Sequence, residues 1–262
     1  PDMSRELTVF LLTLGLFLGM LLLLEVGRRI ALRRMKEDTG APGEGIGAVD
    51  GAVFALLGLL LAFTFSGASS RLDTRRQLIV EETNDIGTAY LRLDLLPSDL
   101  QPALRESFRR YLDARIEVYQ KLPDIAAAKE SLAKANQLQQ QIWRQAVGAS
   151  RAEGAPPAAP ILLAPALNAR IDNTTPRTMA PQWPPPTVVF VMLFGLALAA
   201  SLLAGYGMTG SKLHRWFHMI GFALVMAFAV YVILDIEYPR LGLIRVDAFD
   251  QALVDLRASM NP

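Results

Sequence analysis

The sequence predicts an all-α integral membrane protein, in which four transmembrane helices form two hairpins that flank a helical extramembrane domain. Four long runs without a charged residue carry this prediction, split two and two around a polar middle: Leu7–Leu24, Gly51–Ser70, Val188–Tyr206 and Trp216–Leu234. A bilayer core about 30 Å thick requires about 20 apolar residues in helical form. Inside lipid, backbone amides must be satisfied within their own segment, so each run is expected to be a helix.

The first hairpin is predicted over residues 1–70, with spans at about 7–27 and 50–70. The first run is too long for the apolar region of a signal peptide, and Arg28, Arg29, Arg33 and Arg34 follow it as in a stop-transfer sequence. With Lys36 they make the loop to Gly45 strongly basic. The loop between the third and fourth spans carries Lys212 and Arg215. The positive-inside rule therefore places both loops in the cytoplasm and the helical domain outside a bacterial plasma (inner) membrane.

The helical extramembrane domain is predicted over residues 71–150. A heptad stripe continues from the second span through Leu72, Ile79, Ile86 and Leu93, and no proline intervenes before Pro97. One helix from about Asp50 to Leu96 would be about 70 Å long. Two further helices, separated at Pro123-Asp124, are expected to form an antiparallel hairpin.

Prolines and charges organise the rest of the chain. Residues 151–186 hold nine of the sixteen prolines, which predicts a proline-rich linker and a return helix that is interrupted near Pro176. The second transmembrane hairpin is predicted over 187–237. The tail, 238–262, is predicted to form a helix from near Asp247 that docks on the middle domain or on the membrane surface.

Composition excludes several classes of function. The net charge of +1 gives no field that would attract nucleic acid, and the chain has no cysteine. No phosphate-binding loop or nucleophile elbow is present, so we expect no cofactor and no enzymatic activity. His214 and His218 are the only histidines. They could hold zinc only with a third ligand, and an interfacial position explains them better.

Several segments resemble a known family. Residues 62–68 (AFTFSGA) run into Arg71, Arg75-Arg76, and the segments 79–82 (IVEE) and 86–96 (IGTAYLRLDLL). Residues 165–168 (PALN) with Asp172, and 238–242 (YPRLG), follow in order. This pattern resembles the bestrophin-like family of bacterial membrane proteins. The resemblance covers nearly the whole chain and implies remote kinship to bestrophins, which are pentameric, mostly anion-conducting channels lined by the second membrane helix. Bestrophins keep their bulky domain in the cytosol, opposite to the charge-based orientation.

The second span offers a candidate pore face. In a symmetric ring this stripe would give an acidic mouth, a narrow apolar neck and a hydroxyl-lined exit. The same face could instead pack against the other spans, with the small residues Gly51, Ala55, Gly58 and Ala62 in close helix contact. The stripe, with members spaced by three and four, is Asp50, Phe54, Leu57, Leu61, Phe65, Ser69 and Leu72.

Charged residues beyond this span suggest two further sites. Arg71, Arg75 and Arg76 could attract anions, or could extend to the membrane interface. A second set could bind a hard cation such as calcium, or form a polar network with Arg75, Arg92 or Arg170. That set is Glu81, Glu82, Asp85, Asn168 and Asp172.

Asp235 and Glu237 close the fourth span, where an acidic group is costly and often functional. A surface position beside Arg240 or Arg245 explains them more simply.

The favoured function is an ion channel that lies in membrane lipid and passes small inorganic ions. The resemblance implies a homo-oligomer, specifically a pentamer. A membrane-anchored sensor or scaffold that binds a ligand or partner is the alternative. A carrier would be expected to have broken helices, and no span contains a proline.

Overall fold

The computed structural model describes residues 3–37, 46–121, 124–179, 186–207, 212–237 and 247–260, and within these ranges it contains helices and turns only. This confirms the all-α prediction. The chain divides into two compact units. We call Asp2–Leu72 with Pro184–Ile244 the membrane unit, and Asp73–Trp183 with Arg245–Pro262 the polar unit. The helix α2 (Ile46–Leu91) contributes residues to both.

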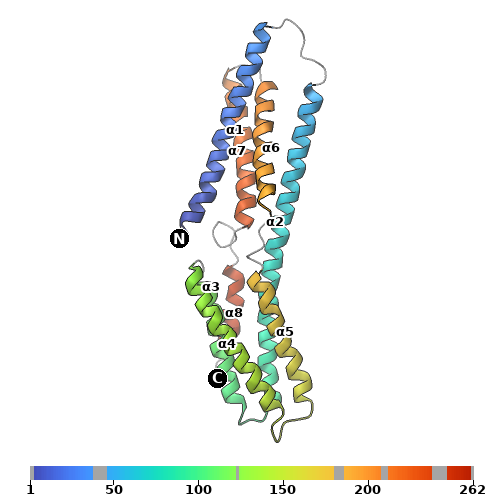
Figure 1. Ribbon diagram of the computed structural model, residues 1–262, viewed down its shortest axis with the longest axis vertical. Helices are drawn as coiled ribbons and strands as arrows, with labels where there is room; N and C mark the ends of the chain where they lie inside the picture. The colour runs from blue at the N-terminus through green and yellow to red at the C-terminus, as the bar shows by residue number, and fades with distance from the viewer. Residues whose placement is uncertain are drawn as a thin grey trace. The chain divides into compact units, whose positions relative to one another are not determined.

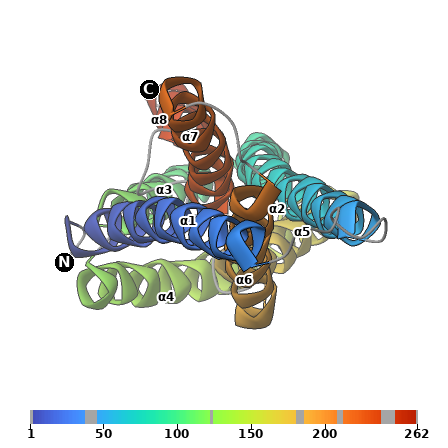
Figure 2. The ribbon, with the colours of Figure 1, turned by 90° about the horizontal axis from the view of Figure 1, so that it is seen from above.

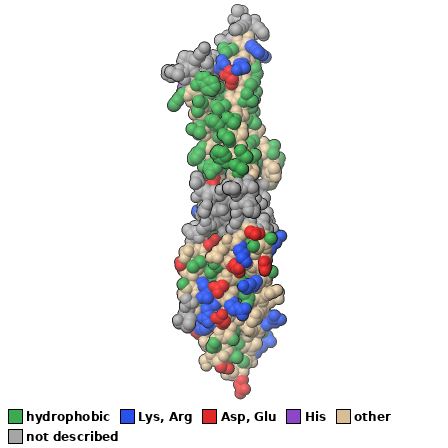
Figure 3. Space-filling view, turned by 90° about the vertical axis from the view of Figure 1, so that its left-hand side faces the viewer, with side chains coloured by type: hydrophobic (Ala, Val, Ile, Leu, Met, Phe, Trp, Pro, Cys, Tyr) green, Lys and Arg blue, Asp and Glu red, His purple; other side chains and the backbone are tan. Residues whose placement is uncertain are grey.

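The membrane unit consists of α1 (Met3–Glu37), the first part of α2, α6 (Thr187–Gly207) and α7 (Lys212–Glu237). Within the described ranges, four segments are long and apolar enough to cross a bilayer, as predicted: Leu7–Arg34, Gly47–Leu95, Thr187–Gly207 and Trp216–Glu237. Hydrophobic side chains cover the face of this unit that Figure 3 presents, whereas the polar unit shows mixed charges there. An apolar outer surface is what a helix bundle in lipid requires.

Helix α1 packs along α6 and α7, and it lies beside α6 in both ribbon views (Figures 1 and 2). Two glycines permit a very close approach of α1 and α6. A Cβ atom built on Gly27 would lie 2.0 Å from the carbonyl oxygen of Leu202, and one on Gly205 would lie 2.0 Å from that of Leu24. Small residues allow the backbones of membrane helices to meet in this way.

The polar unit is built from the rest of α2, the 3₁₀ turn η1 (Arg92–Leu95), α3 (Gln101–Lys121), α4 (Ile125–Ser150), α5 (Ala159–Met179) and α8 (Asp247–Ser259). The α3–α4 hairpin forms as predicted (Figure 1). Asp124 caps α4 by accepting hydrogen bonds from the amides of Ala126 and Ala127. Phe108, Ile142 and Leu253 are fully buried in one apolar core.

The structure answers two questions that the sequence raised, namely whether the return helix is interrupted near Pro176 and where the C-terminal helix docks. Helix α5 continues through Pro176 to Met179, so the predicted interruption was wrong. Pro176 lacks the amide that would bond the carbonyl of Asp172, so it costs α5 one helical bond without ending the helix. Helix α8 docks on the polar unit: Arg257 pairs with Asp113 at 2.7 Å, and the Met260 carbonyl accepts a 3.0 Å bond from Arg109.

Candidate functional site

The predicted pore stripe of α2 is only partly covered by the rest of the membrane unit. Leu57 and Leu72 are buried, with 2% and 5% of their surface exposed. The half-buried side chains are Asp50, Phe54, Leu61 and Ser69. The Phe54 ring meets Phe222 of α7 edge-on, with 6.2 Å between ring centroids. Of the seven residues, only Phe65 is exposed, at 47%.

The small residues of α2 lie on its exposed side. Gly51, Ala55, Gly58 and Ala62 are all exposed, and a Cβ built on Gly51 or Gly58 would meet no atom within 4 Å. Of the four spans, α2 is covered least: 6% of its most apolar window is buried, against 44% for the α7 span. A helix that contributes so little to its own bundle has most of its surface available to a neighbouring molecule.

Arg71 forms an ion pair with Glu237 at the end of the spans. Its Nε donates to both carboxylate oxygens of Glu237, at 3.1 and 3.0 Å, and its Nη2 donates to Oε2 at 2.7 Å. The Glu237 side chain is 1% exposed and that of Arg71 is 34% exposed. Because Glu237 and Asp235 are both buried, their predicted surface position was wrong. The suggested partners Arg240 and Arg245 lie outside the described residues.

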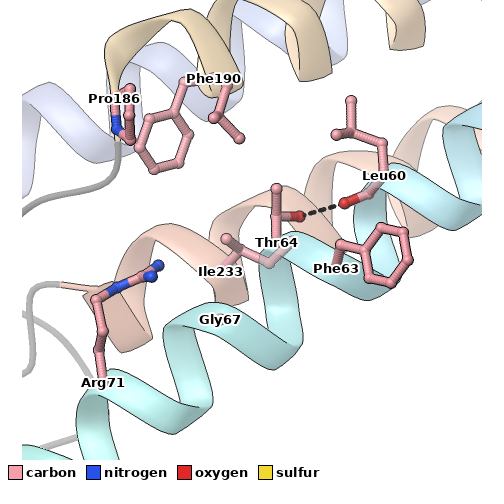
Figure 4. A pocket seen from close by; sticks show the side chains of 9 residues that line it. Leu60, Phe63, Thr64, Gly67, Arg71, Pro186, Phe190 and Ile233 are labelled. Atoms are coloured by element: carbon pink, nitrogen blue, oxygen red, sulfur yellow. Dashed lines mark hydrogen bonds between the residues drawn. The ribbon is translucent and has the colours of Figure 1, made fainter.

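A groove of about 360 Å³ lies between α2, α6 and α7 beside this ion pair (Figure 4). Its surface is mainly apolar. The Thr64 hydroxyl donates a 2.8 Å hydrogen bond to the Leu60 carbonyl oxygen. The guanidinium of Arg71 forms its polar end. The groove is lined by Leu60, Phe63, Thr64, Gly67, Arg71, Pro186, Val189, Phe190 and Ile233.

The other two arginines of the predicted basic group belong to the polar unit. Arg75 and Arg76 are half-buried, and Arg76 lies 3.4 Å from Asp73, one helical turn away. Arg71, in contrast, belongs to the membrane unit and bonds to the buried carboxylate of Glu237.

The described residues of the predicted cation set do not share one site. Glu82 is fully buried and accepts a 2.6 Å bond from Nε of Arg115, which is 1% exposed. Glu81 accepts from Gln77 at 2.8 Å, and Asn168 is exposed. The side chain of Asp172 lies outside the described part. Among the residues described, no three acidic or histidine side chains gather so that they could hold a metal ion.

Sequence reasoning missed the role of Arg115 and the burial of Arg170. Arg115 donates to Glu82 and, through Nη2, to the Tyr119 hydroxyl at 2.7 Å. Arg170 is fully buried, and its guanidinium lies 5.3 Å from the ring of Phe108 and 4.5 Å from that of Tyr111. Burial lowers the pKa of Arg170; the phenol of Tyr111 opposes this shift, and the positive charge of Arg115 adds to it.

A signal for Arg115 was present in the sequence. It stands three and seven residues after Leu112 and Phe108, within the apolar stripe of α3. An arginine at such a position must be buried with a partner. The partner, Glu82, comes from a different helix, so the pair ties α2 to α3 inside the polar unit.

These features define a four-span α-helical membrane protein whose second span is barely covered by its own bundle. A family model described as the bestrophin-like domain matches residues 14–248. The chain therefore belongs to the bestrophin-like family, as its motifs indicated. Comparison with the curated proteins gave no match, and neither did comparison with solved structures.

Proposed function

We propose that this protein is a subunit of a homo-oligomeric ion channel, pentameric by kinship with bestrophins, in which α2 lines the pore and anions permeate. The observation that carries the proposal is the exposure of α2, of which only 6% is buried in its most apolar window. A single chain would leave Gly51, Gly58 and Phe65 facing lipid with little packing. In a ring, this surface would pack on neighbouring subunits or line the lumen.

The proposed pore face is the part of the predicted stripe that the chain leaves open, namely Leu61, Phe65 and Ser69. They follow one another at four-residue spacing, so they share one side of the helix. A ring of phenylalanines can gate ions by dewetting, and the Ser69 hydroxyls would follow it. Leu57 and Leu72 are buried, which supports a packing role for them rather than contact with ions.

The sign of selectivity is supported by the family and by the basic exit of α2. Arg71 is held in place by Glu237, so Arg75 and Arg76 are the arginines proposed to attract the permeating anions. We also propose the inner membrane of a bacterium as the location. The side of the membrane on which the polar unit lies can be tested by labelling single cysteines placed at Arg33 and at Arg105 from either side. The chain has no cysteine of its own, so no background labelling is expected.

The test is ion flux from proteoliposomes, with chloride and potassium measured separately for the wild type and three variants. Phe65→Ala should change the flux while leaving oligomerisation intact. Leu22→Ala, on α1 and 64% exposed, is the matched control and should behave as the wild type. Leu57→Ala should lower thermal stability instead, because it opens a cavity in the bundle.

Two results would reject the proposal. Equal flux in the wild type and Phe65→Ala would show that α2 does not set the conductance. Absence of flux for both ions, with oligomers verified in the same vesicles across the pH and calcium ranges tested, would favour a membrane-anchored sensor or scaffold.

A further inference from the structure

We propose that the groove between α2, α6 and α7 binds one anionic phospholipid, with an acyl chain along its apolar wall and the phosphate on Arg71. This site would lie within the membrane unit of a single chain. The inference does not depend on ion conduction, because it rests on the shape, polarity and depth of the groove.

The apolar part of the groove fits a hydrocarbon chain. Leu60 and Phe63 of α2 and Phe190 of α6 belong to its lining (Figure 4), as does Val189 of α6. The volume of about 360 Å³ lies within the range of about 300–1,000 Å³ that is typical of small-molecule sites. Thr64 adds little polarity, because its hydroxyl bonds to the backbone of its own helix. A water-filled groove would offer more polar partners.

The polar end lies where lipid phosphates are found. Helix α6 begins at Thr187 and α7 ends at Glu237, and Arg71 is the first charged residue of α2 after Asp50. All three helices therefore leave the apolar region at the level of Arg71. Along α2, Leu60 and Arg71 are 11 residues apart, which corresponds to about 16 Å of helix and to the reach of one acyl chain below its headgroup.

The guanidinium of Arg71 has one edge, around Nη1, that Glu237 does not occupy and that could bind a phosphate. Nε and Nη2 hold the carboxylate, whereas Nη1 makes no bond to a described residue. Gly67 leaves room for it, since a Cβ at that position would lie 3.3 Å from Nη1. The ion pair fixes the planar guanidinium, and a fixed guanidinium is well suited to phosphate oxygens.

The groove and the proposed pore face lie on different sides of α2. Phe63 lines the groove, and Phe65 follows two residues later. At 100° per residue, their side chains project about 160° apart around the helix. A lipid in the groove would therefore not obstruct the face around Phe65.

The experiment counts lipids retained by the purified oligomer after delipidation, by native mass spectrometry. Phosphatidylglycerol and phosphatidylcholine are added separately at equal mole fraction. We expect about one phosphatidylglycerol per subunit, retained about tenfold better than phosphatidylcholine. Both lipids carry the phosphate, but the choline cation of phosphatidylcholine is repelled by the guanidinium of Arg71. Val189→Trp should fill the groove and abolish this retention. Val191→Trp, on the same helix and 65% exposed, is the control and should retain the lipid.

A second variant tests the phosphate contact without leaving a buried charge. The double substitution Arg71→Gln/Glu237→Gln removes both charges and keeps both side chains near their native size. It should reduce phosphatidylglycerol retention to the level of phosphatidylcholine. Free phosphate at millimolar concentration should not compete, because it lacks the chain.

Three results would overturn the proposal. Equal retention of the two lipids would indicate nonspecific lipid association only. Unchanged retention in Val189→Trp would locate the lipid elsewhere. A disulfide that forms between subunits carrying Phe63→Cys in native membranes would show that a second copy, and not a lipid, covers the groove.

Discussion

The close approach of α1 and α6 at Gly27 and Gly205 gives the sharpest prediction for the membrane unit. A methyl group on Gly27 would lie 2.0 Å from the Leu202 carbonyl oxygen and 2.9 Å from the Tyr206 amide nitrogen. Both neighbours are backbone atoms, so no side-chain rotation relieves the overlap. Gly27→Ala should therefore force the two helices apart.

The size of the displacement follows from the contact distance. Carbon and carbonyl oxygen approach to about 3.3 Å in close helix contacts, so the helices must separate by roughly 1.3 Å at this level. Leu24, Ala197 and Ala200 are fully buried beside the crossing and would lose packing. Overpacking of this kind costs about 1–3 kcal/mol. For a chain of this size, each kcal/mol lowers Tm by about 2–4 °C.

Thermal unfolding of purified protein in one detergent tests this reasoning. Gly15→Ala on α1 and Gly195→Ala on α6 are matched controls, since a methyl group there meets no atom within 4 Å. The control variants gain the same helix propensity as Gly27→Ala. The difference in Tm between them and Gly27→Ala therefore reports the steric overlap alone. Combining Gly27→Ala with Gly205→Ala should cost less than the sum, because both act on one crossing. Equal Tm values for Gly27→Ala and Gly15→Ala would refute the close contact.

Three further predictions concern the polar unit. Arg115→Ala should destabilise it by about 3–5 kcal/mol, because Glu82 would remain buried without its cation, and the Glu82→Gln/Arg115→Met double variant should recover part of this loss in denaturant unfolding. Asp124→Ala should cost about 1 kcal/mol through loss of the α4 cap, also measured by unfolding, whereas Asp124→Asn should cost less. The hydrogen bond from Lys121 lowers the pKa of Glu117 below 4.5. The Glu117–Lys121 interaction therefore stabilises the fold at neutral pH, and this contribution is lost as pH falls through the lowered pKa. The difference in unfolding free energy between the wild type and Glu117→Gln should vanish in acid.

The helices were largely predictable because their signals are local. Uncharged runs of bilayer length mark the spans, and the absence of proline before Pro97 marks a helix that continues beyond the membrane. The break at Pro123-Asp124 was likewise visible as cap chemistry. Pro176 was misread because a proline removes one helical bond but does not have to end the helix, and α5 continues to Met179.

The charge pairs were not predictable, because they join residues far apart in the chain. Glu237 pairs with Arg71, 166 residues away, whereas local reasoning offered it Arg240 or Arg245. Arg115 could have been flagged as a buried cation from its position in an apolar stripe, but no pattern named Glu82 as its partner. Periodicity identifies the face of a helix that is buried, and only the tertiary arrangement identifies what lies opposite.

The faces of α2 show the same limit most clearly. Protein, lipid and a hydrophobic pore neck all accept bulky apolar side chains, so hydrophobic spacing cannot distinguish among them. Leu57, Phe63 and Phe65 look alike in the sequence, yet Leu57 is 2% exposed, Phe63 is 67% exposed at the edge of a groove, and Phe65 is 47% exposed away from that groove. Because a helix presents residues two apart on nearly opposite sides, substitutions at Phe63 and Phe65 should have separable effects. A change at Phe63 should act on lipid retention, and one at Phe65 on ion flux.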